Sequence, residues 1–219
     1  MFRILVVEDD PSTLQQLRLL LLEMIQGSQV DTAENVVTGI GKFREAYEAR
    51  ASYDAVVLDF KLPTTPGENP EVDSTICQEI VRTRPDTLVV HITAYPLDNE
   101  IEKHLQAVHL EQIGPRVVFL SKLDLDWSEQ LVKRLRSFLY GRRIEQQFDQ
   151  LFVAPAGEAG ARFRPRYAGG ITHPLAALSR DIIAHWEEID EALQRKIKRQ
   201  MYVVKTPDGI RVSLLEPER

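Results

Sequence analysis

One stretch near the middle of the sequence, Ala55-Val56-Val57-Leu58-Asp59, constrains the fold more than any other. Four apolar residues precede an acidic one, and a turn containing Pro63 and Gly67 follows. A short, continuously apolar run is typical of a strand buried on both faces, as in a parallel sheet covered by helices. Open parallel sheets bind ligands outside the carboxyl ends of their strands. We therefore expect Asp59 at the functional edge of such a sheet.

The first two thirds of the chain alternates short apolar runs with amphipathic segments. Strands are expected at Phe2–Val7, Gln29–Ala33, Ala55–Asp59, Thr87–Thr93 and Arg116–Ser121. Helices are expected at 11–26, 35–50, 75–84, 97–112 and from Asp126 past Tyr140, with a loop over Leu62–Ser74. Five strand–helix units with short connections predict right-handed crossovers and one doubly wound, five-stranded parallel sheet.

Composition narrows the class of protein. The net charge is −6, distributed as −8 over residues 1–141 and +2 over 142–219, which indicates two units and argues against a strongly basic nucleic-acid surface. Cys77 is the single cysteine, so an internal disulfide or a cysteine-based zinc site is excluded. No apolar run approaches the roughly 20 residues of a membrane span, and no signal peptide is recognisable. We expect a cytoplasmic protein without a membrane segment.

The ends of four expected strands carry polar side chains that can act together. Glu8 and Asp9 follow the first strand, Asp59 ends the third, Thr93 ends the fourth and Lys122 follows the fifth. Taken singly, each has an ordinary structural use as a helix cap, turn former or surface charge. Together, three carboxylates in one crevice require a cation, and Mg²⁺ suits oxygen ligands. The set predicts a site that holds a phosphoryl group on Asp59.

These residues resemble a known family, the receiver domain of two-component response regulators (CheY-like). The matching motifs are Ile4-Leu5-Val6-Val7-Glu8-Asp9-Asp10, Leu58-Asp59 with Pro63-Thr64-Thr65-Pro66-Gly67, Thr93-Ala94 and Ser121-Lys122. The resemblance covers about residues 1–140 and implies a flavodoxin-like fold. The chain departs from the family where Leu123 stands in place of the proline that usually follows the lysine.

The resemblance also implies roles for the residues. Asp59 would accept phosphate from a sensor histidine kinase or a phosphotransfer protein. Asp9 would bind Mg²⁺ directly and Glu8 mainly through water, and Asp59 and the backbone carbonyl of Lys61 would be further metal ligands. Thr93 and Lys122 would contact the phosphoryl oxygens. Phe119 occupies the position of an aromatic residue that rotates inward on activation.

The tail is expected to follow the receiver as two further parts. Residues 141–171 form an extension of the last helix and a linker, and residues 172–219 form a helical and β-hairpin region. From Thr172 a helix with a break near Glu188 carries an apolar stripe: Leu175, Leu178, Ile182, Trp186, Ile189, Leu193 and Ile197. Met201–Lys205 and Ile210–Leu215 flank the turn Thr206-Pro207-Asp208-Gly209 and predict a hairpin.

Two functions compete for this tail. In the first, the apolar stripe serves self-association or docking of a downstream protein. In the second, the region is a small winged-helix-like DNA-binding output with Arg195, Lys196, Lys198 and Arg199 toward phosphate. The second is not favoured, because acidic residues balance the basic ones. An enzymatic output is not expected, since His173 and His185 lie in no catalytic or metal-binding spacing. The expected function is a phosphorylation-switched response regulator.

Overall fold

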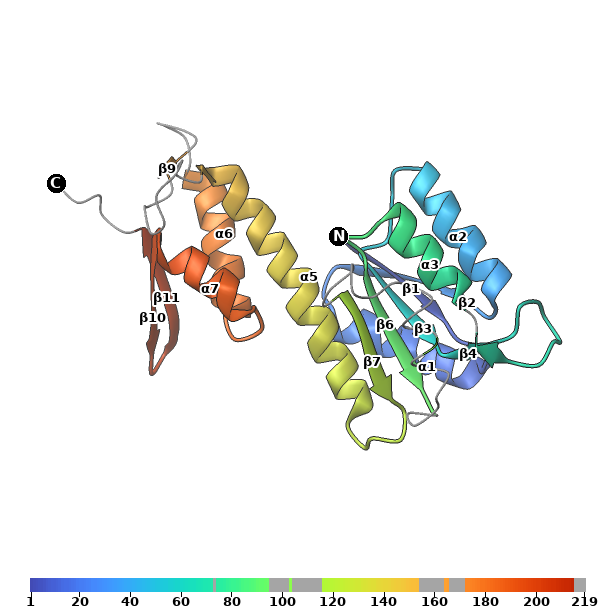
Figure 1. Ribbon diagram of the computed structural model, residues 1–219. Helices are drawn as coiled ribbons and strands as arrows, with labels where there is room; N and C mark the ends of the chain where they lie inside the picture. The colour runs from blue at the N-terminus through green and yellow to red at the C-terminus, as the bar shows by residue number, and fades with distance from the viewer. Residues whose placement is uncertain (73, 95–102, 104–115, 154–163, 166–171, 215–219) are drawn as a thin grey trace. The chain divides into compact units, whose positions relative to one another are not determined.

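The computed structural model describes residues 1–72, 74–94, 103, 116–153, 164–165 and 172–214 (Figure 1). The chain divides into two compact units, Met1–Leu135 and Arg136–Arg219. The finer division expected at residues 140 and 171 stays a prediction. Within the described residues, no helix has both the length and the apolar character needed to cross a membrane.

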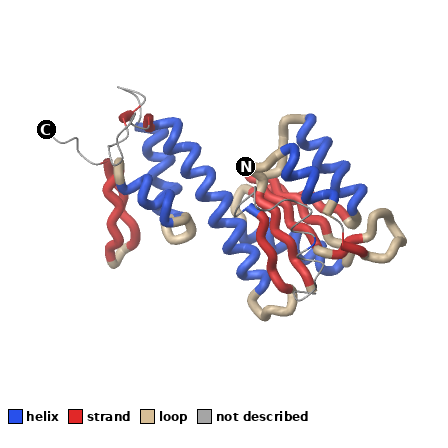
Figure 2. The backbone as a smooth tube through the Cα atoms, viewed as in Figure 1, coloured by secondary structure: helices blue, strands red, loops and turns tan. Residues whose placement is uncertain are grey.

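A five-stranded parallel sheet forms the centre of the first unit (Figure 2). Its strands are β1 (Phe2–Val7), β2 (Ser28–Ala33), β3 (Ala55–Asp59), β6 (Leu88–Thr93) and β7 (Val117–Ser121). They lie in the order β2-β1-β3-β6-β7, which is the 2-1-3-4-5 order of flavodoxin-like folds. The predicted doubly wound sheet is therefore confirmed, and its strand order reverses direction between β1 and β3.

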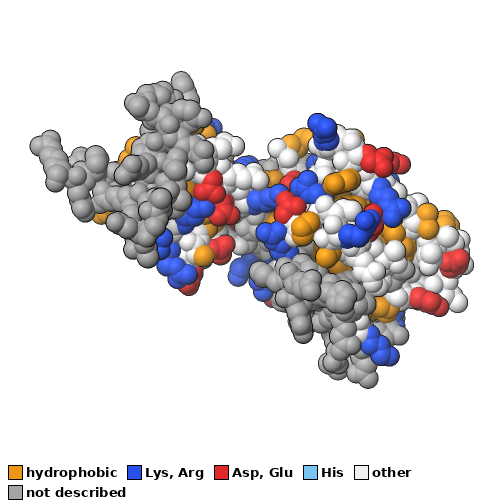
Figure 3. All heavy atoms as spheres, turned by 45° about the horizontal axis from the view of Figure 1, so that its top comes forward, with side chains coloured by type: hydrophobic (Ala, Val, Ile, Leu, Met, Phe, Trp, Pro, Cys, Tyr) orange, Lys and Arg blue, Asp and Glu red, His pale blue; other side chains and the backbone are white. Residues whose placement is uncertain are grey.

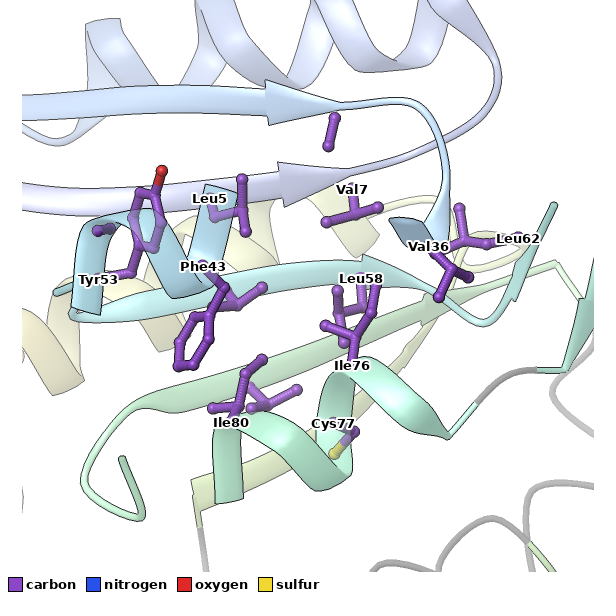
Figure 4. Packing of buried hydrophobic residues seen from close by; sticks show 14 residues of the cluster. Leu5, Val7, Val36, Phe43, Tyr53, Leu58, Leu62, Ile76, Cys77 and Ile80 are labelled. Atoms are coloured by element: carbon purple, nitrogen blue, oxygen red, sulfur yellow. The ribbon is translucent and has the colours of Figure 1, made fainter. Parts of the chain in front are cut away.

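Helices cover both faces of this sheet. α2 (Val36–Glu48) and α3 (Thr75–Thr83) pack on one face, and α1 (Pro11–Met24) lies on the other (Figure 4). α5 (Trp127–Leu151) begins in the first unit and ends in the second. Asp10 and Asn35 cap α1 and α2, each accepting a backbone N–H from the helix that follows.

The apolar residues of the strands explain why the sheet needs two helical layers. Alternate residues such as Leu5, Val7 and Leu58 face α2 and α3, where Phe43 and Ile80 complete a buried cluster (Figure 4). The residues between them are buried as well, on the opposite face. Strands with no polar face can pair only inside a covered sheet, so the apolar run that ends at Asp59 dictates this architecture.

One part of the first unit differs from the expectation, and one expected helix falls on residues that the structure does not describe. The expected loop Leu62–Ser74 contains a small antiparallel ribbon of β4 (Lys61–Leu62) and β5 (Glu71–Val72). Strands of two residues carry no periodic pattern, so the sequence did not indicate them. The helix expected at 97–112 lies outside the described residues except for residue 103.

The second unit is built around the C-terminal half of α5. α6 (Thr172–His185) and α7 (Glu191–Lys198) pack with it, and β10 (Met201–Thr206) and β11 (Gly209–Leu214) form the expected hairpin. A short ribbon of β8 (Phe152–Val153) and β9 (Arg164–Pro165) lies within the segment expected to be a linker. Asp190 caps α7, which explains the break after Glu188.

The apolar stripe of α6 and α7 is covered by the unit itself. All seven of its residues belong to one core together with Ile144, Phe148, Leu151 and Phe152, and Leu178, Ile182 and Ile197 are fully buried. The expectation that this stripe docks a partner or a second copy is therefore wrong. The extension of the last helix that was expected within residues 141–171 reaches Leu151 and supplies the apolar surface that covers the stripe.

Candidate functional site

The strand register brings the predicted site residues to one edge of the sheet. Val7 lies beside Leu58, so Glu8 and Asp59 follow at the same level. Asp59 in turn lies beside Ile92, and Thr93 lies beside Ser121, directly before Lys122. This edge is at the carboxyl ends of β1 and β3, where the strand order reverses. Such a switch point is the usual ligand site of open α/β sheets.

Three carboxylates converge at this edge. Glu8, Asp9 and Asp59 each offer an oxygen, and these oxygens lie within 4.8 Å of one another. Glu8 is buried, whereas Asp9 and Asp59 are partly exposed. The neighbouring Asp10 is occupied as the N-cap of α1, where its Oδ1 accepts the Thr13 N–H at 2.8 Å. Helix capping was the purely structural explanation for this acidic run, and Asp10 is the residue that provides the cap.

Lys122 joins two of the carboxylates. Its Nζ lies 2.8 Å from Glu8 Oε2 and 3.0 Å from Asp59 Oδ2, with the ammonium largely shielded from water. The backbone N–H of Lys122 donates to the carbonyl of Thr93 at 2.6 Å, which extends the pairing of β6 and β7. This pairing fixes the root of the lysine, so its ammonium is held against the acids.

The electrostatics show how crowded the negative charge is. Burial, together with the charge of Asp59, raises the pKa of Glu8 to about 7, although Lys122 opposes the shift. Burial also raises the pKa of Asp9. Burial works against the charge of Lys122, but Asp59 and Glu8 outweigh it and raise the pKa of the ammonium. One lysine therefore does not neutralise the three acids.

This arrangement fits a divalent metal ion. The donors are hard oxygens from three different positions, and one of them is buried where its charge is costly. Mg²⁺ and Ca²⁺ prefer such oxygens, and Mg²⁺ commonly uses one or two carboxylates together with water and phosphate oxygens. A cation bound by Glu8, Asp9 and Asp59 would offset the repulsion that Lys122 leaves uncompensated. The residues present thus suit the expected ion.

The remaining predicted residues lie around this group. Thr93 is buried at the end of β6. Lys61, expected to offer its backbone carbonyl, begins β4 and pairs with Val72 of β5. The roles assigned to Thr93 and Lys61 stay predictions.

An aromatic stack lies directly below the site, and the sequence pattern indicated only one of its members. Phe119 stacks on His91 with 4.8 Å between ring centroids, and both contact Phe60 edge to face. The backbone N–H of Phe60 donates to Asp59 Oδ1 at 2.7 Å. A histidine inside an otherwise apolar strand was the signal that could have drawn attention to this layer. The stack connects the residue after Asp59 with the strand that precedes Lys122.

Among known proteins, only solved structures are similar to this chain. No protein-family model and no curated protein matches the chain. Similar solved structures include the BeF3-activated DrrB receiver domain (25% sequence identity, 64% of this chain, 97% of that chain, TM-score 0.44). A response regulator receiver domain protein from Clostridium thermocellum is similar at 22% identity, covering 66% of this chain and 99% of that chain, with a TM-score of 0.49.

A CheY-like receiver domain protein from Methanospirillum hungatei JF-1 is similar at 17% identity. It covers 68% of this chain and 98% of that chain, with a TM-score of 0.47. These structures are receiver domains, which is the family that the sequence motifs resemble. Their similarity covers about two thirds of the chain.

Proposed function

We propose that this chain is a response regulator of the cytoplasm that is phosphorylated on Asp59 in a Mg²⁺-dependent reaction. The donor would be a sensor histidine kinase or a phosphotransfer protein. The observation that carries the proposal is the contact of Lys122 Nζ with both Glu8 and Asp59, beside a third carboxylate. An aspartate that is only a cap or a turn former has no need of a partly buried ammonium and two further acids.

The proposed chemistry assigns one task to each residue. A carboxylate oxygen of Asp59 attacks the phosphorus of the donor, and the bond to the donor nitrogen breaks as the imidazole leaves. Lys122 is placed to donate to a phosphoryl oxygen, and the hydroxyl of Thr93 is assigned a second donation. Bound Mg²⁺ would supply positive charge to the transferring group. Glu8 and Asp9 would hold that ion.

The proposed readout is a change in the layer beneath the site. A phosphoryl group on Asp59 would form an ion pair with the Lys122 ammonium and would alter the surroundings of Phe60. Because Phe60, His91 and Phe119 contact one another, a shift of one ring changes the packing of the others. If the stack changes between two packing arrangements, it would connect the site with the surface around β7.

The output is proposed to act through protein contacts. DNA binding is the alternative, and the arrangement of two helices and a hairpin suits it. The charges of the second unit argue against DNA binding. Lys196 is paired with both Glu145 and Asp149, and Lys205 is paired with Glu187. A surface for the phosphate backbone needs cations that the protein itself does not neutralise.

Labelling with a small phosphodonor tests the proposed function. Acetyl phosphate or phosphoramidate is expected to give the intact protein one acid-labile phosphate with Mg²⁺ and none with EDTA. Asp59→Asn is expected to abolish the label, because the attacking carboxylate is lost. Asp54→Asn is the matched control, since Asp54 belongs to the same unit but is not part of the site. Equal labelling of Asp59→Asn and the native protein would refute the assignment.

A further inference from the structure

The loop that follows β7 carries Lys122, and the side chains next to this lysine give the loop little support. Leu123 is 67% exposed, Leu125 is fully exposed, and Asp124 and Asp126 are exposed as well. Side chains that stay in water gain little from burial, so packing contributes little to holding this segment. The position of the Lys122 backbone therefore depends mainly on hydrogen bonds.

Ser121, the last residue of β7, accepts two of these hydrogen bonds. Its carbonyl accepts the N–H of Asp124 at 3.2 Å, and its hydroxyl oxygen accepts the N–H of Leu123 at 3.1 Å. A serine hydroxyl that bonds to the N–H two residues ahead closes a tight turn. In addition, the Lys122 N–H donates to the carbonyl of Thr93 at 2.6 Å. The backbone around Lys122 is thus tied to β6 by one bond and to Ser121 by two.

The hydroxyl bond restrains the loop directly after the lysine. An N–H in an exposed loop can bond to water instead of protein, and the backbone is then freer to change conformation. The Ser121 hydroxyl competes with water for the Leu123 N–H and so favours one conformation of the loop. Alanine in place of Ser121 would keep the carbonyl bond to Asp124 but would lose this second restraint.

The Lys122 ammonium depends on a firmly placed backbone. On the face of the first unit that Figure 3 shows, Lys and Arg side chains reach into solvent. The Lys122 side chain is only 18% exposed, and its Nζ lies 2.8 Å from Glu8 Oε2 and 3.0 Å from Asp59 Oδ2. A lysine has a long flexible stem, so its ammonium has many other positions once the backbone moves. A misplacement of about 1 Å can slow a reaction about a hundredfold.

We propose that the Ser121 hydroxyl is a positioning group for Lys122. By accepting the Leu123 N–H, it keeps the loop in the conformation that places the ammonium against both Glu8 and Asp59. Ser121 acts through Lys122 and not on the phosphoryl group itself. The inference rests on the proposed function where Lys122 donates to a phosphoryl oxygen, but the position of the ammonium can be measured without phosphate.

Acetylation of the intact protein by a limiting amount of acetic anhydride tests the position of the ammonium. An ammonium that is shielded and paired with carboxylates stays protonated and reacts slowly. Ser121→Ala is expected to raise the reactivity of Lys122 relative to Lys133 of α5 about fivefold, the change in an equilibrium that loss of one neutral hydrogen bond produces. Ser121→Thr keeps a hydroxyl and is expected to give the native ratio. Ser213→Ala removes an exposed hydroxyl from β11 and is expected to change nothing.

Phosphorylation connects this position with the proposed reaction. With phosphoramidate and saturating Mg²⁺, Ser121→Ala is expected to take up label on Asp59 roughly tenfold more slowly than the native protein. Its Mg²⁺ affinity is expected to stay the same or to become tighter, because the carboxylates are intact. A general loss of structure at this edge of the sheet would weaken Mg²⁺ binding as well.

Leu123→Pro makes the result specific to one bond, because proline has no N–H for the Ser121 hydroxyl to accept. Adding Ser121→Ala to Leu123→Pro is expected to change neither the acetylation of Lys122 nor the rate of labelling. The proposal is overturned if Ser121→Ala leaves Lys122 as unreactive, or labelling as fast, as in the native protein. It is also overturned if Ser121→Thr behaves as Ser121→Ala does, or if Ser121→Ala keeps its full effect in the Leu123→Pro background. A native protein that takes no label would refute the proposed function, and the acetylation of Lys122 would then decide this inference alone.

Discussion

Lys122 contacts two carboxylates, and this double contact determines how the candidate site responds to charge. In the resting arrangement its ammonium lies within 3.0 Å of both Glu8 and Asp59. A metal ion bound by these carboxylates would therefore share Glu8 and Asp59 with the lysine. Removing the lysine leaves the acids with more negative charge for the ion, but it removes the donor assigned to a phosphoryl oxygen.

Lys122→Ala should separate metal binding from the response to phosphate. We expect Mg²⁺ affinity to be unchanged or tighter, and the fluorescence response of Trp127 to phosphorylation to be lost. Trp127 begins α5, five residues after Lys122, and Trp127→Phe identifies its part of the signal. Lys133→Ala, an exposed lysine of α5, is the control for charge. A tenfold loss of Mg²⁺ affinity in Lys122→Ala would contradict this assignment.

Asp31 gives the first unit a pH dependence that is separate from the site. Burial opposes its ionisation, but hydrogen bonds from Tyr53 and Arg3 outweigh burial and lower its pKa. A lowered pKa in the folded state means that Asp31 stabilises the fold above its unfolded pKa of about 4. That contribution is lost as the pH falls through the folded value.

Asp31→Asn should therefore destabilise the protein at neutral pH and much less in acid. The expected loss in the free energy of unfolding is about 1 kcal/mol at pH 7, since the pair is only partly buried. Urea unfolding of both proteins between pH 3 and 7 measures the difference. A difference that grows toward low pH would show that Asp31 does not act in its ionised form.

At the scale of elements, α5 links two cores. Leu131 and Leu135 are buried in its first part, and Ile144, Phe148 and Leu151 belong to the core of the second unit. The same helix thus completes one unit and supplies the wall of the next. Tyr140 stacks on His185, the last residue of α6, with 3.6 Å between ring centroids. Arg136 forms a two-pronged contact with Glu188, so α5 is also tied to the turn between α6 and α7.

Ile182 tests whether the stripe of α6 serves the fold or a partner. It is fully buried, whereas the adjacent Ile183 is 46% exposed on the same helix. Ile182→Glu is expected to destabilise the second unit by roughly 4 kcal/mol, because it places an unpaired charge in the core. Ile183→Glu is expected to change stability by about 0.5 kcal/mol or less.

Trp186 fluorescence during urea unfolding reports on this unit, since that ring is 5% exposed in the same core. Sedimentation of both variants completes the comparison. If Ile182→Glu remained folded and only changed the association state, the stripe would have to be a docking surface after all.

At the scale of the whole molecule, the sequence predicted the parallel sheet and its functional edge, because both depend on local apolar pattern and strand order. The apolar run before Asp59 was sufficient for a covered parallel sheet, and the carboxyl ends of its strands then had to meet. Three features depend on contacts that no local pattern encodes: the β4–β5 ribbon, the cover that α5 provides for α6 and α7, and the left-handed Arg50. Glycine would have signalled that last conformation, and arginine concealed it.

Charge pairing across the second unit leads to the last prediction, that the intact protein does not bind DNA specifically. Of the four basic residues of the DNA-binding alternative, Arg195 pairs with Glu191, Lys196 pairs with Glu145 and Asp149, and Lys198 lies over the Trp186 ring. Few released counterions are then available, so we expect weak binding and a slope of log K against log salt of about 2 or less in magnitude. Anisotropy of labelled duplexes between roughly 50 and 200 mM salt measures this slope.

A double variant, Glu145→Gln with Asp149→Asn, frees Lys196 and should strengthen non-specific binding. A defined duplex bound by the native protein with a slope of several phosphate contacts would favour the DNA-binding output instead.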